Sequence, residues 1–199
     1  MCSSDLAALG AAIDDDAYAR MEMAMAAATE IVVTHEHPDH IGGLIAYADP
    51  AGLSKALRLN KEQAEHVKTY GLAWPAAWDA YAPIDYAGPL AIAPGVVLIR
   101  APGHTPGSQM VYVAREDDKE MLFVGDIGWT MRNIDTGKGR PRLLSQFMLN
   151  EDRDAVFAQL AALHALHEAE PDLIIVPGHD LAAIEELVAA ETIVQGFRP

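Results

Sequence analysis

Apolar residues fall along the chain in short runs separated by polar residues, and these runs predict the strands. Four runs have the length and the bounding turn residues of buried strands. They cover residues 96–100, 109–113, 121–124 and 173–176. Two further runs, 30–34 and 56–59, predict strands nearer the amino terminus, and the β-branched run 30–34 stops directly at His35.

Helical composition and capping residues predict the segments between these runs. Asn60 and Gln63 have the spacing of a capping box, and Gly71 is a typical helix stop. Asn150 is expected to cap the strongest helix in the chain. Residues 126–140, which contain several glycines, are expected to form a long loop. The expected helices cover residues 17–28, 41–48, 60–70, 150–168 and a last segment that begins at Leu181.

Strands and helices alternate, and the sequence contains no internal repeat or linker, so we expect residues 1–199 to form a single α/β domain. Hydrophobic residues make up 51% of the chain and charged residues 22%, which is typical of a globular protein. No apolar run reaches the roughly 18 to 20 residues that a membrane-spanning helix requires. The sequence therefore predicts a domain without a membrane partner.

The charge balance argues against binding to nucleic acid. The chain carries 14 basic and 29 acidic residues, with a net charge of −15. A groove that binds a phosphate backbone needs clustered Lys and Arg, and here they are scattered. A small anionic substrate remains compatible with this charge, because bound metal ions supply local positive charge. The single cysteine, Cys2, allows no internal disulfide and leaves the compartment open.

The first residues, Met1 to Leu6, have neither the basic start nor the apolar stretch of a signal peptide. Their Cys-Ser-Ser-Asp-Leu sequence resembles the translation of a common sequencing adapter. We therefore expect residues 1–6 to be non-native and the natural chain to begin upstream. A cytoplasmic location is the default expectation, but an export signal would lie in the missing part.

The strongest chemical signal is the segment His35-Glu-His-Pro-Asp-His40, which directly follows a predicted buried strand. Imidazole and carboxylate groups are good ligands for zinc and similar divalent ions. In an extended stretch, His35 and His37 project to the same side. Asp39 and His40 fall where the chain turns into a helix and are expected to point at a second position. The pattern H-x-H-x-D-H arises by chance in roughly one chain of this length in a thousand.

Three later residues share the context of a strand end that runs into a loop. His104 lies between two predicted strands, Asp126 ends the run Phe-Val-Gly-Asp, and His179 lies in Pro-Gly-His-Asp. Functional residues of layered α/β folds gather at such positions, because a rigid sheet positions the loops. We therefore expect these three residues to join the His35–His40 segment.

With these motifs present in order, residues 31–180 resemble the metallo-β-lactamase-fold hydrolases. The resemblance implies an αββα sandwich, and the small number of residues before the first motif implies that its amino-terminal strands are missing here. It also implies two divalent metal ions, zinc first and iron or manganese as alternatives. One ion would be held by His35, His37 and His104, the other by Asp39, His40 and His179, with Asp126 bridging the two.

The resemblance implies hydrolysis of a small substrate, with a metal-bridged hydroxide attacking an ester, lactone, thioester or lactam carbonyl. Asp39 is the carboxylate expected to handle the proton. Family members that cleave β-lactams usually lack an Asp at the bridging position, so Asp126 favours ester, lactone or thioester substrates. The loop after Asp126 is expected to contact the substrate through Trp129, Arg132 and Asn133.

Two alternatives stay open at this point. Some relatives hold a single iron ion in the same cavity and act as dioxygenases on a sulfur substrate, and ligand identity alone does not fix the metal. The other alternative is an inactive fragment whose sheet is incomplete. Metal content distinguishes the first alternative, and a thermal melt with and without metal distinguishes the second.

Overall fold

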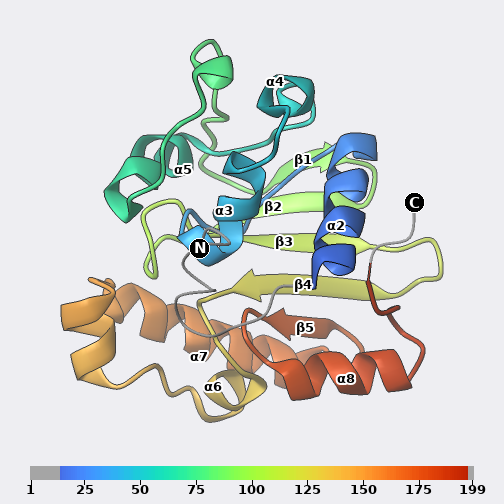
Figure 1. Ribbon diagram of the computed structural model, residues 1–199. Coiled ribbons are helices and arrows are strands. Elements are labelled where there is room, and N and C mark those ends of the chain that lie inside the picture. Colours follow the sequence, from blue (N-terminus) through green and yellow to red (C-terminus); the bar gives the residue numbers. More distant parts are fainter. Residues whose placement is uncertain (1–13, 197–199) are drawn as a thin grey trace.

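The structure is a computed structural model that describes residues 14–196, so the segment 1–6 that we expect to be non-native lies outside the described residues. Five strands form one mixed sheet in the order β1-β2-β3-β4-β5 (Figure 1). The strands are β1 (Leu90–Ala93), β2 (Val96–Arg100), β3 (Gln109–Ala114), β4 (Glu120–Gly125) and β5 (Ile174–Pro177). The pairs β1–β2, β2–β3 and β3–β4 are antiparallel, and the pair β4–β5 is parallel. Strands β2 to β5 confirm the predicted ranges to within one residue at each end, whereas β1 was not predicted.

The helices surround this sheet. The α-helices are α2 (Asp15–Ala27), α3 (Pro38–Ile45), α4 (Pro50–Leu53), α5 (Lys61–His66), α6 (Met131–Thr136), α7 (Arg153–Ala169) and α8 (Leu181–Ala189). Two 3-10 helices, η1 (Val67–Tyr70) and η2 (Ala76–Trp78), and one π-helix, η3 (Leu143–Met148), complete the set. The capping box of Asn60 and Gln63 is present as predicted, and Gly71 ends η1 in the left-handed conformation. None of the described helices is long and apolar enough to cross a bilayer.

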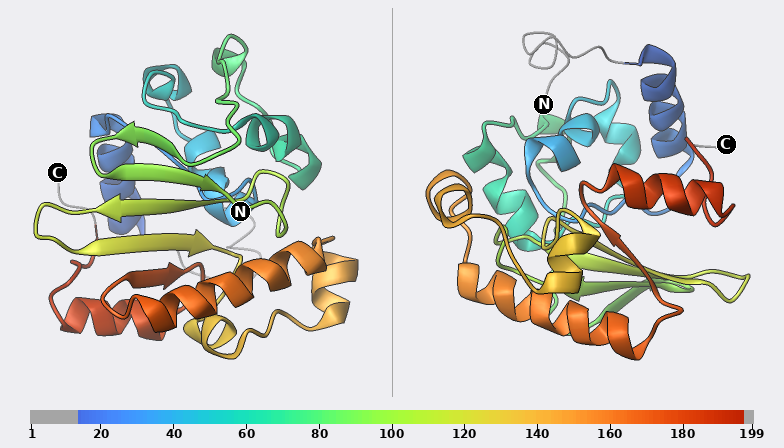
Figure 2. Two further views of the ribbon diagram at one scale, coloured as in Figure 1. Left: turned by 180° about the vertical axis from the view of Figure 1, so that it is seen from behind. Right: turned by 90° about the horizontal axis from the view of Figure 1, so that it is seen from below.

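Two apolar cores hold the elements together. Helix α7 packs through Val156, Leu160 and Leu163 against one face of the sheet, where Leu122 and Val124 of β4 meet it. Helix α2 lies on the opposite side of the sheet from α7, as the view from below in Figure 2 shows. The second core joins α3, α4 and the segments around α5 and η2, and its buried residues are Ile41, Leu44, Leu53, Leu57, Leu59, Val67 and Trp78. This arrangement confirms the predicted layered α/β class.

The predicted strands 30–34 and 56–59 are wrong as strands. The two segments share one isolated bridge, in which Ile31 pairs with Leu57. Side-chain amides of Gln63 and Gln109, instead of a neighbouring strand, donate hydrogen bonds to the carbonyl of Val33. These contacts satisfy the backbone without a ladder, so an extended segment forms but no regular strand.

Two further expectations about local structure are wrong. The predicted loop 126–140 contains α6, because Thr130 and Asn133 form a capping box that starts a helix. Asn150 does not cap α7: it has a φ of 54°, and the helix is capped by Asp152, whose side chain accepts a hydrogen bond from the amide of Ala155. The long helix itself is present, three residues later than predicted.

Candidate metal centre

The His35–His40 segment forms the first part of the site. It leaves the extended stretch that ends at Thr34 and enters α3, with His37 as the N-cap residue and Pro38 at the first helical position. The Thr34 hydroxyl lies 3.2 Å from His35 Nδ1 and 3.4 Å from His40 Nδ1, so it orients two imidazole rings at once. His35 and His37 are both buried.

The loop between β2 and β3 brings His104 to this segment. Buried Glu36 ties the two together, since its carboxylate accepts hydrogen bonds from the Thr105 hydroxyl at 2.8 Å and the Gly107 amide at 3.0 Å. A side chain at position 107 would collide with Gln63 and with Glu36, so only glycine permits this close approach. Glu36 lies between two predicted ligands, and sequence analysis gave it no role.

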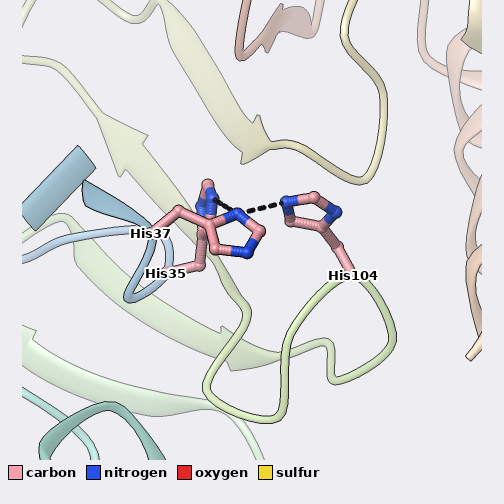
Figure 3. Close-up of side chains that lie close together, drawn as sticks. All are labelled: His35, His37 and His104. Atoms are coloured by element: carbon pink, nitrogen blue, oxygen red, sulfur yellow. Dashed lines mark hydrogen bonds between the residues drawn. The ribbon is translucent and has the colours of Figure 1, made fainter. Parts of the chain in front are cut away.

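His35, His37 and His104 form what we call the first cluster, in which the three rings face one another (Figure 3). His37 Nδ1 lies 3.1 Å from His35 Nε2 and 2.9 Å from His104 Nε2. The two dashed lines in Figure 3 mark these contacts, and both end on His37. The predicted grouping of these three side chains is therefore present in the structure.

Asp39, His40 and His179 form the second cluster, beside the first. His40 Nε2 and His179 Nε2 are 3.4 Å apart, and each lies 3.6 Å from Asp39 Oδ2. His179 follows β5 and Asp126 follows β4. Because the two strands are parallel, their carboxyl ends meet at the same edge of the sheet. The amide of His179 donates to the carbonyl of Trp129, which fixes the two loops together.

Asp126 lies between the two clusters. Its Oδ2 is 3.5 Å from His104 Nε2 and 3.2 Å from His179 Nε2, and its Oδ1 is 3.2 Å from His40 Nε2. The side-chain ligand atoms of His35, His40 and Asp126 also lie close to one another, so the two clusters are adjacent. All seven residues predicted as ligands therefore converge at one place.

The surroundings of His35 and His37 favour their neutral forms. Burial, together with the neighbouring His104, lowers the pKa of His37 to about 4. Burial first and His40 second hold the pKa of His35 far below its ordinary value. A neutral imidazole has a free lone pair on one ring nitrogen, which is the form that binds a metal ion.

Three observations indicate that this donor set fits metal ions. A single ring nitrogen has either one proton or one lone pair, yet His37 Nδ1 faces two other imidazole nitrogens. The spacings of 2.9 and 3.1 Å approach the roughly 3.3 Å between neighbouring ligands of a tetrahedral zinc ion. Among the described residues, Asp126 Oδ1 is also buried without a hydrogen-bond partner.

A cavity of about 640 Å³ opens onto both clusters. Its walls are apolar on one side, where Tyr70, Trp129, Met148 and Leu149 line it. Trp129 also donates a 2.6 Å hydrogen bond to Asp126 Oδ2. Tyr70, Met148 and Leu149 were not predicted, because η1 and η3 lie far from the motifs in the sequence.

The structure places Arg132 and Asn133 on α6 and not among the residues that line the cavity. Arg132 is exposed, and Asn133 accepts from the Thr130 amide and donates to the Lys138 carbonyl. Their role in substrate contact stays a prediction. Two other residues that the sequence did not single out, Arg140 and Glu151, are buried directly behind His104.

Comparison with known proteins extends these observations. The family model described as metallo-beta-lactamase superfamily matches residues 29–179. N-acyl homoserine lactonases of Bacillus sp and of Bacillus thuringiensis subsp. kurstaki are each 30% identical to this chain over 105 residues. That stretch covers 53% of this chain and 40% of each relative, so the likeness spans well under half of those proteins.

Solved structures resemble this chain in fold. An N-acyl homoserine lactone hydrolase, with N-hexanoyl-L-homoserine bound at its catalytic metal centre, superposes with a TM-score of 0.57 at 20% identity, covering 79% of this chain and 58% of that one. The dizinc quorum-quenching lactonase AidC gives a TM-score of 0.52 at 16% identity, covering 77% and 58%. The family model covers most of the chain and includes both clusters, and we conclude that the chain belongs to the metallo-beta-lactamase superfamily.

Proposed function

We propose that this chain is a metal-dependent hydrolase that opens the ester bond of a lactone carrying an apolar substituent. The observation that carries the proposal is the convergence of five histidines and two aspartates beside one cavity, which five of the seven line. The first cluster would hold one divalent ion, the second cluster another, and Asp126 would bridge them. Such ions, when bound, lower the pKa of coordinated water and polarise a carbonyl oxygen.

Asp39 is the residue proposed to move the proton. Its carboxylate lies at the cavity, and its side chain is 42% exposed, so a water molecule and a substrate can both reach it. In the hydrolysis, water adds to the carbonyl carbon, the ring C–O bond breaks, and the leaving oxygen takes up a proton. The Asp39 carboxylate would accept the proton of the attacking water and return it to the leaving oxygen.

Trp129 is proposed to hold the bridging carboxylate in place. Its indole N–H donates to Asp126 Oδ2, which leaves Oδ1 directed toward the imidazole of His40. The Trp129 ring also lines the cavity, so the same side chain contacts the substrate. The predicted substrate contact of Trp129 is part of this proposal.

The apolar wall supports a substrate with a hydrocarbon group beside its carbonyl. Tyr70, Met148 and Leu149 face the cavity, and Met148 is 73% exposed. The neighbouring Leu143 and Phe147 are 71% and 73% exposed, so an apolar surface continues outward from the cavity. The relatives described above are N-acyl homoserine lactonases, whose name denotes a lactone with an acyl substituent, and this likeness supports the same substrate class here.

Metal content is the first test. Purified protein loaded with zinc should hold about two equivalents by elemental analysis, and His104→Ala should hold fewer. His164→Ala is the matched control, because His164 lies on α7 with a side chain 39% exposed and belongs to neither cluster. One equivalent of iron in the purified protein would instead favour a dioxygenase, and folded protein without metal would contradict the proposal.

Substrate class is the second test. Zinc-loaded protein is given N-acyl homoserine lactones with acyl chains of increasing length, a thioester and a β-lactam, and acid release is followed with a pH indicator. We expect the lactones to react fastest and kcat/KM to rise with chain length as the apolar wall is filled. Faster cleavage of the thioester or the lactam, or equal rates for all chain lengths, would contradict the proposed substrate.

A further inference from the structure

The two ring nitrogens of His104 face different surroundings. Nε2 points into the first cluster, 2.9 Å from His37 Nδ1. Nδ1 points away from it and lies 2.6 Å from Oε1 of Glu151. Both side chains in this second contact are only 1% exposed, so water does not compete for it.

This contact determines which nitrogen of His104 carries the proton. An ionised carboxylate only accepts hydrogen bonds, so Nδ1 must donate to Glu151, and the lone pair of the neutral ring is then on Nε2. Arg140 also lies 3.2 Å from His104 Nδ1, but its guanidinium contacts the same Glu151 oxygen and finds its acceptor there. Glu151 therefore directs the free lone pair of His104 toward the first cluster.

Arg140 connects this pair to the opposite side of the site. Its guanidinium lies 4.8 Å from the centre of the Trp129 ring, and Trp129 in turn donates to Asp126. The side chain of Arg140 is 4% exposed, and its charge is balanced by Glu151. Contacts thus run from His104 through Glu151, Arg140 and Trp129 to Asp126. They link the segment after β4 to the first cluster.

The backbone around Glu151 is fixed to the loop that carries His104. The amide of Asp152 donates to the carbonyl of Gly103 at 2.9 Å, and the amide of Glu151 donates to the carbonyl of Ser145 at 2.8 Å. Asp152 is also the N-cap of α7. The backbone that carries the carboxylate is therefore held by a helix start and by the His104 loop.

We propose that Glu151 is a positioning residue for the metal centre, which holds His104 in the Nδ1–H form with Nε2 free to bind a metal ion. Arg140 supports it by balancing its charge. The inference rests on the proposed function for the presence of the metal. A partner of this kind on a ligand histidine typically changes metal affinity by roughly 10- to 100-fold.

The test uses Glu151→Gln, with Glu151→Asp as the conservative variant and Asp154→Asn as the control. Asp154 is exposed two residues into α7, so the control removes the same charge without touching His104. Zinc affinity is measured by chelator competition, and the tautomer of His104 is read from imidazole nitrogen chemical shifts of the metal-free protein. A purely structural role of Glu151 would lower the melting temperature without changing this tautomer.

We expect Glu151→Gln to weaken zinc binding by roughly 10- to 100-fold and to shift His104 away from the Nδ1–H form. Glu151→Asp should recover part of both effects, and Asp154→Asn should behave like the unchanged protein. Wild-type zinc affinity together with an unchanged tautomer in Glu151→Gln would overturn the inference. If the wild type binds no zinc, the proposed function fails, and the tautomer of the metal-free protein still decides the role of Glu151.

Removal of one partner of a buried ion pair can also unfold a protein, because the other charge is left unpaired. If Glu151→Gln does not fold, the double variant Glu151→Gln/Arg140→Gln removes both charges and serves in its place. The same two measurements then apply, and the same outcomes support or overturn the inference.

Discussion

Gly178 lies directly against the carboxylate of Asp126, so a Cβ at position 178 would overlap Asp126 Oδ1. The same Cβ would lie 3.0 Å from the backbone carbonyl of Gly125. The amide of Gly178 meanwhile donates to the Gly125 carbonyl at 3.0 Å, so the strand ends β4 and β5 cannot separate to make room. The glycine before His179 is therefore what allows the two parallel strands to present their side chains to one site.

We expect Gly178→Ala to displace the Asp126 carboxylate and to lower bound zinc from about two equivalents to one or fewer. The overlap should also cost about 1–3 kcal/mol of unfolding free energy. Gly88→Ala is the control, because a Cβ there meets nothing within 4 Å. Elemental analysis and urea unfolding check both effects, and full zinc content in Gly178→Ala would contradict the expected displacement.

Metal removal should lower the thermal stability of the protein. A ligand that binds only the folded state at about 100 times its Kd adds about 2.7 kcal/mol, which corresponds to roughly 5–11 °C for a chain of this size. Thermal melts with zinc and after treatment with dipicolinate measure the difference. His104→Ala should lose most of this increment, and an undiminished increment would place the zinc elsewhere.

The pair of Glu62 and Arg100 should make stability depend on pH. The hydrogen bond from Arg100 holds the pKa of Glu62 below its ordinary value and outweighs the opposing effect of burial. A lowered pKa stabilises the folded state above the unfolded pKa of about 4.3, and this stabilisation is lost as pH falls through the folded value. Glu62→Gln should therefore melt about 1–3 °C lower at pH 7, which reflects roughly 0.2–1 kcal/mol for a partly exposed pair.

The gap between Glu62→Gln and wild type should shrink as pH falls below the unfolded pKa of about 4.3, and it should close once Glu62 is protonated in the folded state too. Melts from pH 3 to pH 8 measure this gap. Glu65→Gln is the control, because it removes the same charge from α5. The exposed Glu65 forms only a loose ion pair with Lys61, at 4.0 Å. A gap that stays constant across the whole range would show that Glu62 acts through packing and not through its charge.

A substitution of Leu160 tests the packing of the apolar core between α7 and the sheet. The Leu160 side chain is fully buried between α7 and the sheet, so Leu160→Ala should cost about 2–5 kcal/mol by urea unfolding. Leu181, at the start of α8, is 71% exposed, and Leu181→Ala should change stability by no more than about 0.5 kcal/mol. Equal losses for the two variants would mean that α7 does not pack as the structure shows.

The convergence of the seven residues predicted as ligands could be foreseen because each lies in a motif that follows an apolar run. The capping box of Asn60 and Gln63 is equally local, since both partners lie within one helical turn. The strand at 30–34 failed for the opposite reason: its β-branched residues favour an extended backbone, but a regular strand also needs a neighbour, and only a bridge to Leu57 forms.

Residues whose roles depend on contacts between distant segments could not be identified from the sequence. Glu151 looks like an ordinary acid before a helix, and only the folded chain shows that it is buried against His104. The same holds for Tyr70 and Met148, which reach the cavity from η1 and η3. Their roles depend on contacts between distant segments, whereas the His35–His40 motif carries four of the seven predicted ligands in six consecutive residues.

The apolar wall of the cavity is formed in part by segments that do not carry the predicted ligands. Tyr70 and Met148 come from segments that contribute neither cluster residues nor Asp126, and Met148 is largely exposed. The Tyr70 ring packs against the ring of His37, with centroids 4.5 Å apart, so Tyr70 is coupled to a predicted ligand. Under the proposed function, a substitution at Met148 would therefore change which substrates fit while all seven predicted ligands stay in place. Under the proposed function, selectivity could therefore change through η3 while the loops that carry the predicted ligands stay unchanged.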